Sequence, residues 1–318
     1  MELTPETIFQ NYQKKELDKD TTINYLISLI ENSNNENFRV DSLKIIRKIQ
    51  GFDDKLFRFI ENLLISDSNV NIRCQTAKII RSHYLKNSIS LLNWSLKHET
   101  DIECLSIIIK TLIEIDTLES KTILFEEIKK IKKLKQLHAH QMVSNNHFRK
   151  PLKVLLKKTK FKDLSSELLG DILLNYKTIL TIKNKFYSVY YELKDTKLIK
   201  LDLSDVEFEV RGWKAEFKNN IQYFSDIPGL YNLKSLESLY LSNNIISTID
   251  GIQELSNLSY LDLSNNKIKD IETLNVFKSM PNLRKVKLSG NSIAKDIKIM
   301  ELGRRLNINF HIKSDHFS

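Results

Sequence analysis

LESLYLSNNIISTI, residues 236–249, and LSYLDLSNNKIKDI, residues 258–271, follow one pattern of leucine, asparagine and isoleucine. The second copy begins 22 residues after the first. Every matching position keeps that offset, from the pair Leu236 and Leu258 to the pair Ile249 and Ile271. A fixed period of this form predicts one β-strand per turn of a solenoid. Because a solenoid exposes a long row of strand side chains and rarely performs covalent chemistry, the pattern indicates binding as the activity.

Further copies extend the pattern in both directions. One begins at Leu283 and carries Asn291 at the matching place, and a degenerate one begins at Leu198, with Val206 where asparagine is expected. The asparagine amide after each strand can hydrogen-bond backbone groups that the turn would otherwise leave without partners. Residues 198–312 therefore resemble the leucine-rich repeat family, specifically the 22-residue class seen in regulatory subunits of protein phosphatase 1.

Both ends of this solenoid carry sequences that we expect to cap it. Residues 187–201 alternate apolar and polar side chains around a turn at Asp195, which predicts a β-hairpin at the front. At the far end, residues 297–305 have a helical pattern and residues 307–312 alternate like a final strand, which is similar to the capping unit of such solenoids. An insert at residues 204–235 separates the degenerate first copy from the second.

The first part of the chain contains a different repeat. Residues 1–180 have apolar side chains at helical spacing and almost no Gly or Pro. Five residues recur 34 positions later, namely Ser33, Phe38, Arg39, Ser42 and Ile46 as Asp67, Ile72, Arg73, Thr76 and Ile80, and a weaker third copy begins near Ile102. This recurrence resembles HEAT repeats, which are stacked helix pairs. The resemblance implies that Asp67 and Arg73 link neighbouring repeats, and the first copy departs from it because Ser33 replaces the aspartate.

These patterns together predict an α+β repeat protein. A HEAT-like α-solenoid is expected over residues 1–180, followed by a short, capped leucine-rich repeat solenoid over residues 181–318. No Pro- or Gly-rich linker separates the two parts, so we expect them to dock rather than to move as separate beads.

Composition restricts the setting in which the protein works. No stretch approaches the roughly 20 uncharged apolar residues that span a bilayer, so we expect no membrane insertion. The start, MELTPETIFQ, lacks the pattern of a signal peptide, which predicts a cytoplasmic protein. Cys74 and Cys104 take equivalent places in adjacent helical repeats. Stacked helices lie about 8–10 Å apart and a disulfide requires Cα atoms within about 7 Å, so we expect no disulfide.

Positive charge is concentrated in residues 121–162, which hold 13 Lys or Arg and two acids, a net charge of +11 in a chain of net charge +9. Such a field suits nucleic-acid phosphates or an acidic protein surface, or it only keeps the protein soluble. Lys greatly outnumbers Arg and few aromatic residues interleave, which weighs against recognition of bases. The candidate polyanion-binding residues are Lys129, Lys130, Lys132, Lys133, Lys153, Lys157 and Lys158.

Sequence motifs of enzymes are missing. The chain has no GxGxxG or GxxxxGK[ST] motif, no CxxC pair and no HExxH motif. His138 and His140 lie two residues apart, so on a helix they would point in different directions and could not share a metal. We therefore expect no catalytic residues, no cofactor and no metal site.

The variable strand positions of the repeats are expected to line the concave face of the solenoid. Neighbouring strands lie about 4.8 Å apart, so Tyr240 and Asp262 should stack in one column, with Asp202 and Lys287 at its ends. Tyrosine brings apolar area with a polar tip, which suits protein recognition. The candidate protein-binding residues are Glu237, Tyr240, Tyr260, Asp262, Arg284, Lys285 and Lys287.

The sequence thus predicts a non-enzymatic scaffold or adaptor. Its protein partners, of unknown identity, would bind the concave leucine-rich face and the α-solenoid. The alternative is a nucleic-acid or ribonucleoprotein-associated factor that docks through residues 121–162.

Overall fold

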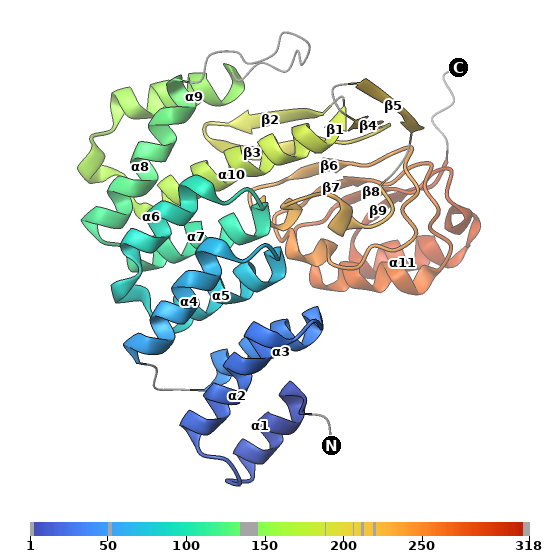
Figure 1. Cartoon of the computed structure of the whole chain (residues 1–318). Helices are drawn as coiled ribbons and strands as arrows, with labels where there is room; N and C mark the ends of the chain where they lie inside the picture. Colours follow the sequence, from blue (N-terminus) through green and yellow to red (C-terminus); the bar gives the residue numbers. More distant parts are fainter. Residues whose placement is uncertain are drawn as a thin grey trace. The chain divides into compact units, whose positions relative to one another are not determined.

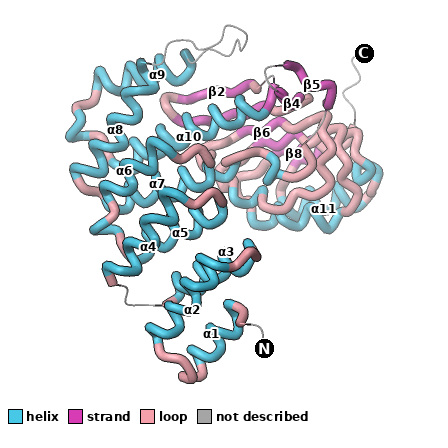
Figure 2. Tube along the Cα trace, viewed as in Figure 1, coloured by secondary structure: helices cyan, strands magenta, loops and turns pink. Residues whose placement is uncertain are grey.

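Figure 1 shows the helices and strands of the computed structural model of the chain. By their internal packing, residues 1–124 and residues 125–318 form two compact units. The first unit is helical in its described part, and the second contains the β-sheets (Figure 2). This order confirms the predicted fold class, in which a helical solenoid precedes a strand-rich one. The structure describes residues 3–49, 53–133, 146–187, 189–205, 207–210, 213–218 and 221–313.

Most α-helices of the first unit begin at a side-chain cap, and α6 (Ile89–His98) is an exception. The helices are α1 (Pro5–Gln13), α2 (Lys19–Asn32), α3 (Glu36–Lys48), α4 (Asp54–Ser66), α5 (Val70–His83), the 3₁₀ turn η1 (Leu85–Asn87), α6 (Ile89–His98) and α7 (Ile102–Ile115), and α8 (Leu118–Lys133) crosses into the second unit. An Asp or Asn side chain accepts hydrogen bonds from first-turn backbone N–H groups at Asp18, Asn35, Asp53, Asn69 and Asp101. Each such cap satisfies donors that have no partner within the helix.

Helices of the first unit pack in successive pairs, α2 with α3, α4 with α5, and α6 with α7. The second helices of the pairs also contact one another, because α5 packs against both α3 and α7. Ile46, Ile80 and Ile109 of these three helices are fully buried. Each pair therefore buries its apolar face against the next, which is the arrangement of a helical-repeat solenoid.

Ion pairs join consecutive helix pairs. Arg39 on α3 pairs with Asp67, which ends α4, and Arg73 on α5 pairs with Glu99, at 2.7 Å from Nε and 3.0 Å from Nη2. Asp67 and Arg73 thus link neighbouring repeats, as the resemblance to HEAT repeats implies, although each bonds a different neighbour. Glu99 follows the end of α6, the first helix of the third pair, just as Asp67 follows the end of α4, the first helix of the second pair. Membership of the HEAT family stays a prediction.

Cys74 and Cys104 are both free thiols. The two side chains nevertheless lie within hydrogen-bonding distance of each other. This hydrogen bond and, after it, burial raise the pKa of the Cys104 thiol. Contact between α5 and α7 brings the thiols together at this point. The spacing of helix axes does not predict this contact, because the axes can stay apart while side chains between them meet.

The main sheet of the second unit has the strand order β2-β3-β6-β7-β8-β9. Its strands are β2 (Tyr190–Lys194), β3 (Lys197–Asp202), β6 (Ser238–Tyr240), β7 (Tyr260–Asp262), β8 (Lys285–Lys287) and β9 (Asn309–His311). β2 pairs antiparallel with β3, and all later pairs are parallel. The convex side is built from 3₁₀ turns, η3 (Phe224–Asp226), η4 (Leu230–Asn232), η5 (Ile252–Glu254), η6 (Ile271–Ser279) and η7 (Ser292–Lys295).

The leucines of the repeat form the core of this solenoid. Six of them, Leu236, Leu239, Leu241, Leu258, Leu261 and Leu263, have no exposed surface. The asparagine ladder is present as predicted: Asn266 Nδ2 donates to the carbonyls of Leu241 at 2.8 Å and Leu263 at 3.0 Å. Its Oδ1 accepts from the backbone N–H of Ile246 at 2.9 Å. Each such amide satisfies backbone groups of two successive turns.

A second ladder, which the sequence analysis does not predict, runs beside the first. Asn265 Nδ2 donates to Asn243 Oδ1 at 2.7 Å, and Asn243 Nδ2 donates to Asp205 Oδ2 at 2.8 Å. Each of these residues has a positive φ, between 52° and 56°. Asn and Asp tolerate this left-handed conformation better than most residues, so the turn chemistry selects them. Gly290 occupies the corresponding turn of the next repeat, with φ 76°.

Both predicted caps are present. The front hairpin turns at Asp195, with φ 58°, between β2 and β3. At the other end α11 (Lys298–Leu306) is followed by β9, which pairs with β8. The insert contributes β4 (Glu207–Val210) and β5 (Trp213–Lys218), which form a separate antiparallel sheet with β1 (Phe186–Tyr187).

The remaining helices of the second unit are α9 (Asn146–Lys158), the turn η2 (Phe161–Asp163) and α10 (Ser166–Lys185). α10 packs against β1, β3 and β4, and Lys185 at its end hydrogen-bonds the carbonyl of Asp226. The domain boundary at 180/181 stays a prediction, and α10 itself continues to Lys185. Both α9 and α10 belong to the unit of residues 125–318 that contains the sheets.

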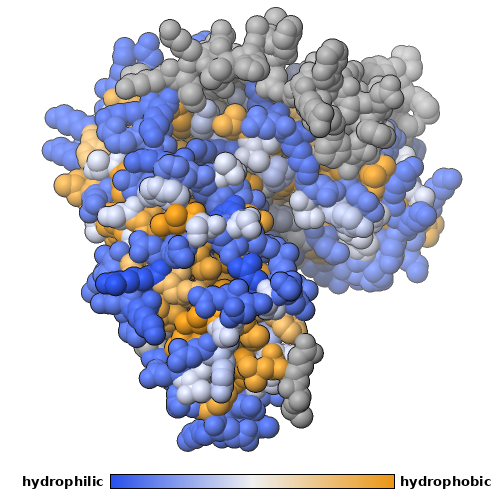
Figure 3. All heavy atoms as spheres, in the orientation of Figure 1, coloured by the Kyte–Doolittle hydropathy of each residue, from blue (hydrophilic) through white to orange (hydrophobic). Residues whose placement is uncertain are grey.

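The surface is mostly hydrophilic on the face that Figure 3 presents, and apolar residues show over part of the first unit. Tyr25, Ile65 and Trp94 of that unit are each 40% exposed. Single exposed apolar side chains are ordinary on soluble surfaces. Within the described ranges, no helix has the length and apolar character required to cross a membrane.

Candidate functional site

Parallel pairing places the variable strand residues in two straight columns on the concave face. The central column is Asp202, Tyr240, Asp262, Lys287 and His311, and the adjacent column is Lys200, Ser238, Tyr260, Lys285 and Asn309. The stacking predicted for Tyr240 with Asp262, between Asp202 and Lys287, is therefore correct. β2 extends the central column with Tyr190 and the adjacent column with Glu192.

Tyr240 and Tyr260 belong to different columns but touch on the diagonal. Their ring centroids lie 4.9 Å apart with an interplanar angle of 38°. Lys200 Nζ lies 5.2 Å from the Tyr240 ring centroid, and Lys285 Nζ lies 5.8 Å from that of Tyr260. Such contacts between cations and rings are stabilising by about 0.5–1 kcal/mol at exposed sites. We call these four residues the tyrosine cluster.

Both tyrosines are half-buried, so part of each side chain stays accessible. The Tyr260 hydroxyl donates to Asp262 Oδ2 at 3.3 Å, which helps to fix its ring. Lys200 is held by Glu192 at 2.8 Å, and this hydrogen bond raises the pKa of the Lys200 ammonium. The Lys200 ammonium therefore stays charged beside the Tyr240 ring.

The two aspartates of the central column are turned toward their own strands. Asp262 is only 8% exposed, and its Oδ1 accepts from the backbone N–H of Ser264 at 2.9 Å. Asp202 accepts from Ser204 in the same way, also at 2.9 Å. The carboxylate of Asp262 is thus engaged in structure, and its predicted part in binding would be to hold Tyr260 rather than to meet a partner directly.

The other predicted contact residues lie around this cluster. Lys285 and Lys287 are half-buried in the columns, and Glu237 and Arg284 are exposed just before their strands begin. Arg284 Nη1 donates to the carbonyls of Pro281 at 2.6 Å and Leu283 at 3.1 Å. The structure therefore brings all seven predicted residues to one side of the sheet or its rim. The three basic residues lie on β8 or directly before it.

The basic segment is less uniform than its sequence indicates. Lys129 pairs with Glu126 at 2.6 Å and lies 4.7 Å from the Phe125 ring centroid, and Lys130 pairs with Glu127. The two acids of residues 121–162 thus neutralise two of the candidate lysines. Lys153, Lys157 and Lys158 are exposed on α9. The side chains of Lys132 and Lys133 lie outside the described residues, as do His138, His140 and His147.

Among the described residues, no group of three or more His, Cys, Asp or Glu side chains could hold a metal ion. What sequence reasoning misses at the site is the diagonal contact of the tyrosines and the lysines over their rings. Column membership follows from the repeat, but diagonal contact depends on side-chain rotamers, which the repeat does not specify.

Comparisons with known proteins agree with this geometry. Family models described as "Leucine rich repeat" and "Leucine Rich repeats (2 copies)" match residues 229–268 and 256–299. The second unit contains a leucine-rich repeat domain. The matched residues of this domain include both tyrosines and the strands β6, β7 and β8. A leucine-rich repeat presents its variable strand positions on one concave surface, which supports the view of the two columns as a binding face.

Among solved structures, the chain is similar to an internalin (inlF) from Listeria monocytogenes str. 4b F2365, with 23% identity and a TM-score of 0.25. The match covers 39% of this chain and 33% of the internalin chain, so this chain corresponds to about a third of that protein. No match was found among curated proteins.

Proposed function

We propose that the leucine-rich repeat domain is a non-enzymatic protein-binding module, and that a partner binds its concave face at the tyrosine cluster. The observation that carries the proposal is the diagonal contact of Tyr240 with Tyr260, at 4.9 Å between centroids, with a lysine over each ring. Binding energy at protein interfaces concentrates in a few aromatic or arginine anchors that lie near the centre of the contact.

The surroundings of the cluster favour a protein partner. Ser238 and Ser242 beside the tyrosines are small, so a partner side chain can approach the rings. Half-buried tyrosines lose little conformational entropy when they are covered, because their rings are already packed. The helical solenoid of residues 1–124 would supply a further contact surface in this scaffold, as repeat solenoids do elsewhere. The cytoplasmic location predicted from the sequence remains part of the proposal.

The test is to replace the rings while the fold is kept. Tagged wild-type protein and the Tyr240→Ala, Tyr260→Ala variant would be used to capture partners from the same extract, with quantitation by mass spectrometry. Tyr223→Ala is the matched control, since Tyr223 is 45% exposed and lies outside the two columns. Partners that bind the concave face would be lost from the double variant and retained by the control. Equal capture by all three proteins would contradict the proposal.

The alternative function, docking on nucleic acid or another polyanion, rests on α9. Lys153, Lys157 and Lys158 are exposed there, and none forms an ion pair with a described residue. Binding to phosphates would weaken steeply with salt, because each neutralised phosphate releases counterions. Titration of a single-stranded oligonucleotide at two salt concentrations checks this; absence of binding at low salt would eliminate the alternative.

A further inference from the structure

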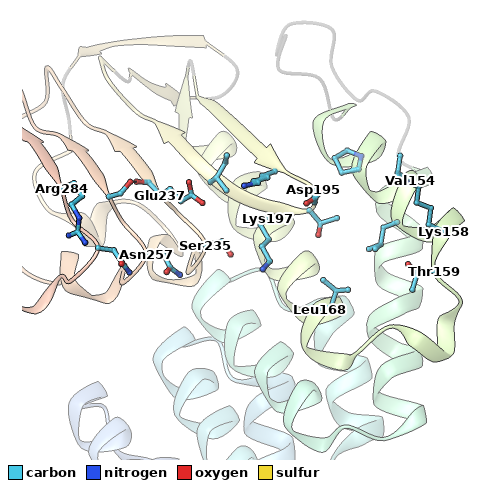
Figure 4. A pocket seen from close by; sticks show the side chains of 17 residues that line it. Val154, Lys158, Thr159, Leu168, Asp195, Lys197, Ser235, Glu237, Asn257 and Arg284 are labelled. Carbon is cyan, nitrogen blue, oxygen red and sulfur yellow. The ribbon is translucent and has the colours of Figure 1, made fainter.

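The second unit contains an open groove of about 1210 Å³ between α9 and the rim of the leucine-rich sheet. Figure 4 shows its construction: Val154 and Lys158 on α9 line one side, Asn257 and Arg284 line the other, and the β2–β3 turn with Asp195 and Lys197 lies between them. All of its lining residues fall within residues 125–318. We call it the α9 groove.

One wall of the α9 groove is apolar. It is formed by Pro151, Val154 and Leu155 on α9 and by Leu168 at the start of α10. Val154 is 51% exposed, although α9 buries Leu152 almost completely. α9 therefore presents an apolar strip to the groove that its own packing does not use.

The opposite wall is polar and follows the repeat. Asn257 Nδ2 donates to the carbonyl of Lys234 at 2.7 Å, and Asn282 Nδ2 donates to that of Ser256 at 2.9 Å. Each amide keeps its oxygen and one N–H without a partner among the described residues. Ser259 Oγ donates to the Glu237 carbonyl at 3.0 Å and keeps its acceptor capacity. This wall offers donors and acceptors together, which is what a peptide backbone requires.

The charge of the α9 groove is unbalanced. Lys158, Lys194, Lys197 and Arg284 line it against two acids, Asp195 and Glu237. None of the three lysines forms an ion pair with a described residue. Lys153 and Lys157, which do not line the groove, add exposed positive charge on the same helix. Acidic ligands are therefore favoured over basic ones.

We propose that the α9 groove binds an extended acidic peptide segment of a partner protein, with an apolar side chain against Val154 and carboxylates near Lys158 and Lys197. The groove is larger than the roughly 300–1,000 Å³ of typical small-molecule pockets, so it has room for several residues of chain. A polyanion without apolar groups would leave the Val154 wall uncovered.

This site is separate from the tyrosine cluster. Neither Tyr240 nor Tyr260 lines the groove, and the residues that do, such as Glu237 and Ser259, precede the columns at the rim. The inference therefore goes beyond the proposed function, and either can fail without the other.

The experiment selects peptides from a random 12-residue phage library on the purified full chain and measures the affinities of fluorescein-labelled winners by anisotropy. We expect the winners to combine Asp or Glu with at least one Leu, Ile, Val or Phe. The Lys158→Glu, Lys197→Glu variant should bind them about tenfold or more weakly. Lys267→Glu, Lys269→Glu is the matched control and should retain affinity within about twofold, since it reverses two exposed lysines of the second unit that do not line the groove. The replaced side chains are exposed, so all variants should fold, which circular dichroism checks.

Several outcomes would overturn the proposal: no selected peptide, no acidic enrichment, or equal affinity for the Lys158→Glu, Lys197→Glu variant. An oligonucleotide that binds the wild type, depends on Lys158 and Lys197 and is unaffected by Val154→Asp would identify a polyanion site instead. Tyr240→Ala, Tyr260→Ala should leave peptide affinity unchanged. Loss in that variant would mean one continuous concave site and no separate groove.

Discussion

A Cβ atom at Gly290 would lie 1.9 Å from Oδ1 of Asn265, in the turn of the preceding repeat. Gly290 also has φ 76°, which side chains rarely adopt. The Asn265 amide therefore fills the space that a side chain at position 290 would need.

Gly290→Ala should accordingly destabilise the leucine-rich domain by about 1–3 kcal/mol, from the positive φ and the collision with Asn265. Chemical denaturation measures the change. Adding Asn265→Gly should recover the part that is due to the collision, while the strain in φ remains. If Gly290→Ala leaves the free energy of unfolding unchanged, Asn265 does not occupy this space in solution.

Asn266→Leu should cost about 1–3 kcal/mol or more, because it leaves the carbonyls of Leu241 and Leu263 and the N–H of Ile246 without their partner. Gln253→Leu is a suitable control, since Gln253 is exposed in the preceding repeat. Melting temperatures of the two variants give the comparison. Equal melting temperatures would show that the buried ladder contributes little.

The Arg73–Glu99 pair gives the helical solenoid a pH dependence. Burial alone would raise the pKa of Glu99, but hydrogen bonds from Arg73 and the Asp101 backbone outweigh it, so the net pKa is lowered below 4.5. A carboxyl whose folded pKa is lowered stabilises the fold above its unfolded pKa and loses that contribution as pH falls through the folded value.

Glu99→Gln should therefore be less stable than the wild type at neutral pH, by about 2 kcal/mol, because Arg73 then lacks its partner. The difference should shrink as the pH falls below the ordinary range of a carboxyl pKa and through the lowered pKa of Glu99, where the folded wild type takes up the proton. Unfolding followed at several pH values checks both parts. A difference that stays constant down to pH 3 would contradict the lowered pKa.

How much the sequence predicts depends on whether a feature repeats. The 22-residue period fixes the strands, the columns and the burial of Asn244 and Asn266, because each follows from one side chain per turn at a fixed place. The resemblance of the 34-residue recurrence to HEAT repeats likewise implies that Arg73 joins neighbouring helix pairs. It does not identify Glu99 as the partner of Arg73, because the third copy near Ile102 has a different spacing and carries Glu103 where the earlier copies have arginine.

Features that depend on packing between unlike elements escape the sequence. The α9 groove needs both Val154 on a helix and Asn282 before a distant strand, and no pattern relates the two. The same holds for α10. Its apolar pattern in the sequence is that of any solenoid helix, and only the structure shows that it packs against β3. Of the site, the column of Tyr240 is predictable, whereas its contact with Tyr260 is not.

The affinity of an isolated concave-face partner for the Tyr240→Ala, Tyr260→Ala variant tests the central claim most directly. Calorimetric titration of that partner into the wild type and the variant, at matched stability, measures it. The tyrosine cluster predicts a loss of roughly 30-fold or more, equivalent to about 2 kcal/mol for an anchor of an interface. A dissociation constant unchanged within about twofold would contradict the claim that this partner is held by the tyrosines of the leucine-rich face.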